Sequence, residues 1–280
     1  MLKQRIITAL ALLLVLLPAL FHSDSRFLAF IGLILIGAAV WEWSRLNQLN
    51  QFHSVFWALF SAGLCAVAYG TDTIVSLGAS FWLLISASWV LFGSFYLQGG
   101  QVRWQTTHRG IRQLIGLCIL ISSWLALYQL KLMGTNFLLS VLLLVWVADI
   151  SAYFAGRRWG RHKLAPHISP GKSWEGLIGG VSGVFFLSIM WLYLDDVFPI
   201  LQESVFQKLH AHGWLMFVTS ILFLTLMSVM GDLVESMVKR SAGAKDSSRL
   251  LPGHGGVLDR LDAMLPVLPI AMMLILYGAS

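Results

Sequence analysis

The chain has 280 residues, of which 58% are hydrophobic and only 11% are charged, and its formal net charge is +6. Soluble domains are about 45–50% apolar and ~25% charged, so this composition excludes an ordinary water-soluble fold. It predicts an all-α integral membrane protein. The positive charge requires no nucleic-acid partner, because basic loops on the cytoplasmic side of a membrane explain it.

Apolar runs long enough to cross a hydrocarbon layer of about 30 Å recur along the chain. They predict about nine transmembrane helices, at residues 6–21, 27–43, 55–69, 74–97, 113–130, 137–155, 176–194, 214–231 and 257–279. The first run follows Lys3 and Arg5 and has an alternative interpretation as a cleaved signal peptide. No convincing small-x-small cleavage site follows it, so we expect a retained helix.

Lys and Arg divide unequally between the two sides of this arrangement. Fifteen lie on the side of the N-terminus, and three (Arg26, Lys131 and Lys208) lie on the other, with Arg260 left aside inside the last segment. Basic residues concentrate in cytoplasmic loops. We therefore expect a cytoplasmic N-terminus, an external C-terminus and a multi-pass position in the cell membrane, which in a bacterium is the inner membrane.

The chain divides at about residue 135 into two unlike regions. Residues 1–135 contain plain apolar segments joined by short loops, which suit scaffold or packing roles. Residues 136–280 contain two long cytoplasmic loops, 156–175 and 232–256, and acidic residues within membrane segments. An ionisable residue inside a membrane segment is costly, so it is a functional-site hypothesis by default. We therefore expect the catalytic region in residues 136–280.

Four aspartates lie in these segments or at their cytoplasmic ends: Asp149, Asp232, Asp259 and Asp262. One interpretation is that they are helix-end charges that reach the interface. Asp259 and Asp262 share a helix face, and we expect Asp259 to face Asp232 across the helix pair. Carboxylates held close together on rigid helices suit Mg²⁺, which takes oxygen ligands and retains waters and phosphate oxygens. Asp232, Asp259 and Asp262 are the candidate ligands.

Two cytoplasmic stretches combine glycine with basic residues. In Pro170-Gly171-Lys172-Ser173 the first glycine of a P-loop is missing, which argues against a P-loop ATPase and leaves Lys172 free to meet a phosphate. Ser173, with Glu175, is expected to start the next helix. The second stretch contains Lys245-Asp246 and then Pro252-Gly253-His254-Gly255-Gly256. Backbone N–H groups in such a turn can point towards an anion, so residues 253–256 predict a phosphate cradle, with an ordinary tight turn as the alternative.

These stretches resemble the signature of the phosphatidate cytidylyltransferases, or CDP-diacylglycerol synthases. The main match is Ser236-x-x-Lys239-Arg240-x4-Lys245-Asp246 followed by Pro252-Gly253-His254-Gly255-Gly256-x-x-Asp259-Arg260-x-Asp262. Upstream motifs of that family are similar to Asp149, Tyr153-x-x-Gly156-Arg157 and Ser169-Pro170-x-Lys172-Ser173-x-Glu175-Gly176. The resemblance covers the C-terminal half and is specific, because many positions agree over the 27 residues of the main match.

The resemblance implies that CTP and phosphatidic acid give CDP-diacylglycerol and pyrophosphate at the cytoplasmic face of the lipid bilayer, with Mg²⁺ required. It implies an active site of Asp232, Ser236, Lys239, Asp259 and Asp262. The residues expected to bind substrate are Lys172, Ser173, Arg240, Lys245, Gly253, His254, Gly255, Gly256 and Asp149. Whether a second, monovalent cation joins Mg²⁺ stays open, and a homodimer is an expectation from the resemblance alone.

Two other functions are alternatives to this one. A CDP-alcohol phosphotransferase also uses clustered intramembrane aspartates, but its Asp-Gly-x-x-Ala-Arg string is absent from this sequence. A cation-coupled transporter would favour acids near the midplane of broken helices. Here the acids lie mostly at cytoplasmic helix ends beside a basic, glycine-rich loop, which favours the enzyme.

Overall fold

The structure, a computed structural model, describes residues 2–197 and 203–277. Its helices and strands are α1 (Leu2–Phe21), α2 (Arg26–Leu46), α3 (Gln51–Gly70), α4 (Ala79–Thr106), α5 (Arg109–Met133), α6 (Thr135–Trp159), β1 (Lys163–Ala165), β2 (Ser169–Ser173), α7 (Trp174–Val197), α8 (Val205–His210), α9 (Trp214–Ser241), α10 (Leu258–Leu261) and α11 (Met264–Tyr277). Eight described helical stretches are long and apolar enough to span a membrane. An all-α integral membrane protein is thereby confirmed. The first segment contributes a shorter apolar helix, Leu10–Phe21, so the count of nine stays a prediction.

Most predicted membrane segments fall inside the observed helices, but the fourth is displaced. The segment predicted at 74–97 begins at Ala79 and continues to Thr106 as α4. It begins late because Asp72 has a positive φ of 52° and the following residues form successive turns. Gly100, with φ of 60°, interrupts the helical geometry inside α4. The last predicted segment is divided into α10 and α11, with Asp262 and Ala263 between them, and α11 ends at Tyr277; the final two residues of the prediction lie outside the described residues.

A short β-hairpin replaces most of the loop predicted at 156–175. Strands β1 and β2 are antiparallel, and Lys163 pairs with Ser173. The residue before a proline favours extended backbone, which suits Ser169 at the start of β2. The second predicted loop is also shorter than expected, because α9 continues to Ser241, so the irregular segment begins at residue 242.

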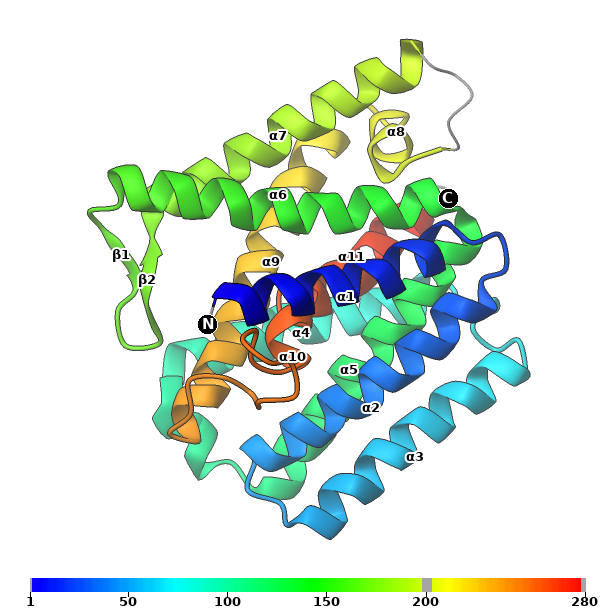
Figure 1. Ribbon diagram of the computed structural model, residues 1–280. Coiled ribbons are helices and arrows are strands. Elements are labelled where there is room, and N and C mark those ends of the chain that lie inside the picture. The colour runs from blue at the N-terminus through cyan, green and yellow to red at the C-terminus, as the bar shows by residue number, and fades with distance from the viewer. Residues whose placement is uncertain (1, 198–202, 278–280) are drawn as a thin grey trace.

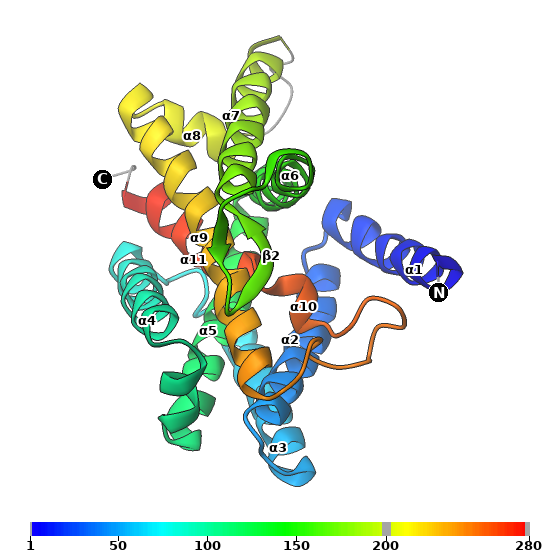
Figure 2. The ribbon, with the colours of Figure 1, turned by 90° about the vertical axis from the view of Figure 1, so that its left-hand side faces the viewer.

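The hairpin and the segment between α9 and α10 lie at the same end of the molecule as the N-terminus (Figure 1). Figure 2 looks onto this end and places the hairpin beside α9, with the α9–α10 segment between α9 and α1. The two regions divided at residue 135 are therefore brought together here. Their helices also share a core, since α11 packs against α4, α5 and α9.

Small residues bring α6 and α7 into close contact. A Cβ added at Gly179 would lie 2.2 Å from Ala155 Cβ, and one added at Gly183 would lie 2.1 Å from Ser151 Oγ. Small residues allow membrane helices to approach closely and gain van der Waals contact. The α6–α7 pair, visible at the top of Figure 1, is therefore a closely packed unit.

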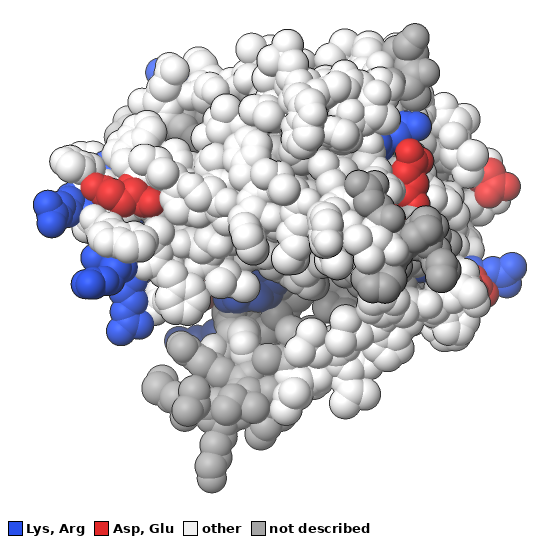
Figure 3. Space-filling model, turned by 90° about the horizontal axis from the view of Figure 1, so that it is seen from above, with Lys and Arg blue, Asp and Glu red and all other residues white. Residues whose placement is uncertain are grey.

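The outward surface is largely apolar. Leu14, Phe52, Phe186 and Leu215 each expose more than 70% of their surface. Seen from above, most charged side chains lie towards opposite edges, and the face between them is uncharged apart from a few basic side chains deeper in the view (Figure 3). This pattern is expected where hydrocarbon contacts the protein.

One basic residue on the expected external side is buried for a structural reason. The ammonium of Lys131 donates to Leu20 O at 2.6 Å, to His22 O at 3.1 Å and to Thr135 Oγ1 at 2.7 Å. It thereby connects α5 to the turn between α1 and α2. Lys131 is therefore a packing residue of the bundle.

Candidate active site

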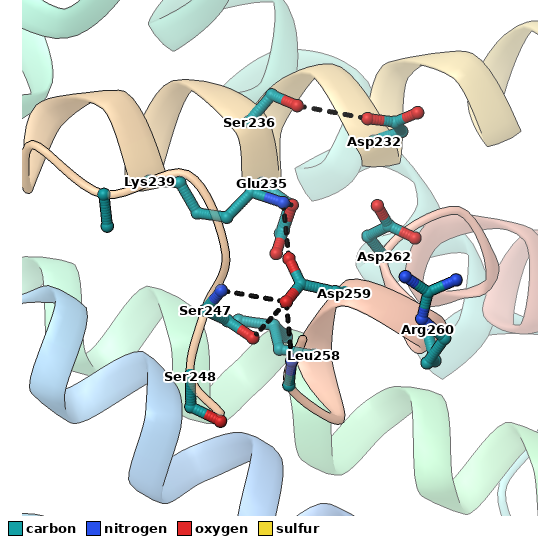
Figure 4. A network of polar contacts seen from close by, with 12 residues as sticks. Asp232, Glu235, Ser236, Lys239, Ser247, Ser248, Leu258, Asp259, Arg260 and Asp262 are labelled. Atoms are coloured by element: carbon teal, nitrogen blue, oxygen red, sulfur yellow. Dashed lines mark hydrogen bonds and ion pairs between the residues drawn. The ribbon is translucent and has the colours of Figure 1, made fainter. Parts of the chain in front are cut away.

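The C-terminal half of α9 carries the polar residues of the candidate site (Figure 4). Ser236 donates to Asp232 Oδ1 at 3.2 Å, one helical turn away. Lys239 lies between two carboxylates: its ammonium is 2.6 Å from Asp259 Oδ1 and is also paired with Glu235. Lys239 is only 9% exposed, so both ion pairs are largely shielded from water.

Asp259 is enclosed by hydrogen-bond donors. Besides Lys239, its carboxylate accepts from the backbone N–H of Ser247 at 2.9 Å, from Ser247 Oγ at 2.9 Å and from the N–H of Gly256 at 2.7 Å. Gly255 has φ of +84°, and a Cβ there would lie 2.6 Å from Asp259 Oδ2. The glycine-rich turn therefore encloses a carboxylate of its own chain.

This enclosure corrects two predictions. Asp259 does not face Asp232; it turns towards Lys239 and Ser247, and Asp262 lies nearer to Asp232 (Figure 4). The Asp259 carboxylate takes this direction because the Lys239 ammonium and the N–H groups of Ser247 and Gly256 surround it. Two N–H groups of the predicted phosphate cradle are also not available to an anion. The N–H of His254 donates to the carbonyl of Leu251, and the N–H of Gly256 donates to Asp259.

A cavity of about 460 Å³ lies beside Asp232, between α6, the hairpin, α7 and α9. Asp149, Tyr153 and Gly156 line it from α6, where their spacing of four and three residues places them on one helix face. On the opposite wall, Lys172 places its ammonium 2.6 Å from Asp232 Oδ2. The cavity thus combines Asp149 and Arg157 from α6 with the ion pair between Lys172 and Asp232.

The hairpin holds Lys172 in place through its two ends. Ser173 accepts the N–H of Gly176 at 3.1 Å and so caps the start of α7, as the sequence predicted. Glu175 contacts His162 instead, accepting its backbone N–H at 3.2 Å and lying 2.6 Å from its Nδ1. Both contacts fix the base of the hairpin against α7.

Comparison with known proteins assigns the family. The family model described as the cytidylyltransferase family matches residues 3–277. The chain belongs to the cytidylyltransferase family. It is similar to proteins named phosphatidate cytidylyltransferase from Pseudomonas aeruginosa (37% identical, covering 96% of this chain and 95% of that one), Haemophilus influenzae (33%, 96% and 96%) and Staphylococcus epidermidis (30%, 98% and 99%).

Several residues expected to bind substrate lie away from the cavity of this cytidylyltransferase. Lys245 and Gly253 are exposed in the segment after α9. Arg240 donates to the carbonyl of Ala244 at 3.1 Å, which closes the end of α9. Only Asp149, Lys172 and Ser173 of the expected substrate-binding residues line the cavity. Sequence spacing does not reveal this, because the course of residues 242–257 decides where the loop residues lie.

Two acids in the network were absent from the predicted site. Glu42 on α2 is fully buried and contacts the α9–α10 segment, and Glu235 on α9 is almost fully buried beside Lys239. Both had a usable signal in the sequence, since each is an ionisable residue within an apolar run. Glu42 stands between two tryptophans in the second apolar segment.

The hydrogen-bond donors around each carboxylate decide which of them could bind Mg²⁺. In the described part of the chain, no three His, Cys, Asp or Glu side chains form a group that could hold a metal ion. Asp259 is a poor ligand, because an ammonium already contacts its Oδ1 and three donors contact its Oδ2. Asp232 and Asp262 remain. Asp232 is paired with Lys172 and accepts from Ser236, so it is open to an ion only when Lys172 turns to a substrate phosphate. One or two carboxylates completed by water and substrate phosphates are usual for Mg²⁺. The residues present therefore fit such an ion.

Proposed function

We propose that this chain transfers the cytidylyl group of CTP to phosphatidic acid, giving CDP-diacylglycerol and pyrophosphate. The observation that carries the proposal is the cavity beside Asp232, in a chain similar over nearly its whole length to proteins named for that activity. The cavity joins carboxylates and Lys172 at one end of an apolar bundle. A lipid phosphate and a nucleotide triphosphate can meet at such a place.

The lipid substrate brings its own nucleophile. The second pKa of a phosphomonoester is about 6, so a phosphatidate oxygen is largely ionised at neutral pH and needs no general base. That oxygen forms a bond to the α-phosphorus of CTP. The bond from this phosphorus to the bridging oxygen breaks, and pyrophosphate leaves with the electron pair. The protein must bring two polyanions together and stabilise the charge on the leaving group.

The cavity residues can meet these requirements. We infer that Lys172 exchanges Asp232 for a substrate phosphate, since its ammonium already lies in the cavity wall. Lys239 does not line this cavity; Asp259 and Glu235 hold its ammonium, and we infer that it contacts a substrate phosphate from there. If Mg²⁺ is bound, Asp232 and Asp262 would hold it, and it would neutralise charge on the phosphates. The helices and the hairpin hold these groups at fixed positions relative to one another, so the two substrates can be oriented for reaction.

The aromatic residues near the cavity suit a lipid headgroup. Tyr153 and Trp174 are exposed at the same end of α6 and α7. Tyr and Trp are enriched where a membrane meets water. We infer that the phosphate of phosphatidic acid reaches the cavity at this level while its acyl chains stay in the bilayer.

An incorporation assay separates this function from its rivals. With the purified protein, label from α-³²P-CTP should enter the chloroform-soluble lipid only when phosphatidic acid is present, whereas label from γ-³²P-CTP should appear in pyrophosphate. A CDP-alcohol phosphotransferase would instead consume CDP-diacylglycerol and release CMP. Absence of lipid labelling in a folded preparation would overturn the proposal.

We also propose that the cavity faces the cytoplasm, the compartment that contains CTP. In a cysteine-free background (Cys65→Ala, Cys118→Ala), an impermeant maleimide added outside should label Lys208→Cys but not Lys163→Cys or Arg249→Cys. Permeabilised membranes should allow all three to react. Labelling of Arg249→Cys from outside intact cells would reverse the orientation inferred from the fifteen-to-three distribution of basic residues.

A further inference from the structure

Glu42 on α2 is fully buried and is bound to a segment more than 200 positions away in the sequence. Its Oε1 accepts from Ser248 Oγ at 2.5 Å and from the N–H of Val257 at 2.9 Å. Its Oε2 accepts from the N–H of Leu258 at 2.7 Å and lies 3.0 Å from Ser247 Oγ, whose single proton is shared with Asp259 Oδ2 at 2.9 Å. All four donors belong to residues 247–258, the second half of the segment that connects α9 to α10 and the start of α10.

Among the described residues, only these four hydrogen-bond donors compensate the buried Glu42 carboxylate. None of the ion pairs within the described residues includes Glu42. A buried carboxylate is very costly unless hydrogen bonds or an opposite charge compensate it. Residues 247–258 therefore depend on Glu42 for their position, and Glu42 depends on them for its burial.

The contact leads directly to the candidate site. A Cβ added at Gly256 would lie 2.4 Å from Glu42 Oε1, so the backbone at this position passes as close to the carboxylate as a glycine permits. Gly256 also donates its N–H to Asp259, and the Ser247 hydroxyl lies within hydrogen-bond distance of both Glu42 and Asp259. Asp259 in turn contacts Lys239. One polar network thus runs from α2 to α9.

We propose that Glu42 is a positioning residue for the cytidylyl transfer: it holds residues 247–258 so that Asp259 keeps Lys239 in its place. The inference rests on the proposed function. It assigns a role in the reaction to the region 1–135, which the sequence predicted as scaffold only. Glu42 does not line the cavity and acts through the segment that it holds.

The test compares Glu42→Gln with Asp195→Asn in the purified full-length protein. Glutamine keeps the shape of Glu42, but its NH₂ group would confront donors. Asp195 is also a buried acid, and it accepts a hydrogen bond from Ser204 outside the site network. We expect Glu42→Gln to lower kcat about 100-fold, since a displacement of about 1 Å can have that effect, with little change in the KM for phosphatidic acid. Asp195→Asn should keep its kcat.

Hydrogen exchange provides a readout that does not depend on activity. In Glu42→Gln, amides of the peptide 247–258 should exchange faster, because the N–H of either Val257 or Leu258 then faces the amide NH₂ in place of an acceptor oxygen, while peptides from α6 and α7 should be unchanged. Unchanged exchange at 247–258 with normal kcat would overturn the proposal. Faster exchange throughout the protein would also overturn it, since Glu42 would then have only a general stabilising role.

A smaller change protects the test against misfolding. Ser248→Ala removes one of the four donors, and it should loosen the same peptide and lower kcat by a smaller factor. In a double-mutant cycle, the losses from Glu42→Gln and Ser248→Ala should be non-additive, because the two residues share one contact. Additive losses would contradict the proposal. If the wild-type protein labels no lipid, the proposed function fails, whereas the exchange experiment still tests the role of Glu42 in holding the segment.

Discussion

Lys239→Met should reduce turnover by about 100- to 1000-fold, the loss expected when one charge-stabilising contact to a transition state is removed. The same substitution leaves Glu235 and Asp259 without their shared cation. Breaking a buried ion pair by removing one partner costs about 3–5 kcal/mol. A fall in melting temperature should therefore accompany the loss of activity, and turnover must be measured on protein shown to be folded.

A second variant separates the two roles of Lys239. Lys239→Met combined with Glu235→Gln removes one buried negative charge together with the cation, and it should recover much of the melting temperature. If Lys239 contacts a substrate phosphate, the turnover of this double variant should stay low. Recovery of both stability and turnover would mean that Lys239 serves only to neutralise its neighbours.

Arg45→Met is the matched control. Arg45 is basic and lies at the same end of the bundle, but it contacts Gln51 and the ring of Trp41 rather than the site. Turnover should change little in this variant. If Arg45→Met and Lys239→Met lost equal activity, the basic residues would act by fixing orientation in the membrane, and the phosphate contact would be excluded.

The sequence was informative wherever helical periodicity decides the geometry. Asp232, Ser236 and Lys239 recur at intervals of four and three, a spacing that places residues on one helix face, and all three lie in the C-terminal half of α9. The same reasoning placed Asp149, Tyr153 and Gly156 along one wall of the cavity. The apolar runs located the helices, because hydrocarbon requires a continuous internally bonded backbone.

The sequence was not informative about contacts that depend on the course of an irregular segment. Nothing in the spacing of Asp259 and Asp262 tells which one turns towards Asp232. That choice follows from the folding of residues 242–257 around Asp259. The contact between Glu42 and residues 247–258 could not be predicted for the same reason, since no periodicity relates α2 to a segment more than 200 positions later. The hairpin was missed because its strands are too short for an alternating pattern to appear.

Asp262 is a candidate Mg²⁺ ligand and Asp259 is not, so the activities of Asp262→Asn and Asp259→Asn should respond differently to the Mg²⁺ concentration. If Asp262 helps to hold Mg²⁺, Asp262→Asn should raise the Mg²⁺ concentration for half-maximal activity by at least about 10-fold, the lower end of the change seen when even a supporting group of a metal site is lost. High Mg²⁺ should then restore part of the turnover. Equilibrium dialysis with CTP should give the same shift in the Mg²⁺ dependence of binding.

Asp259→Asn should abolish cytidylyl transfer without any rescue by Mg²⁺. The amide that replaces one oxygen would lose the ion pair with Lys239 or place its NH₂ against the donors of Ser247 and Gly256. Either outcome displaces Lys239 and the turn, and added metal corrects neither. Raising the pH should not help, because the proposed nucleophile is the substrate's own phosphate. Rescue of Asp259→Asn by Mg²⁺ to the extent seen in Asp262→Asn would make Asp259 a metal ligand, as its sequence position first predicted, and near-normal activity at ordinary Mg²⁺ would remove Asp259 from the site.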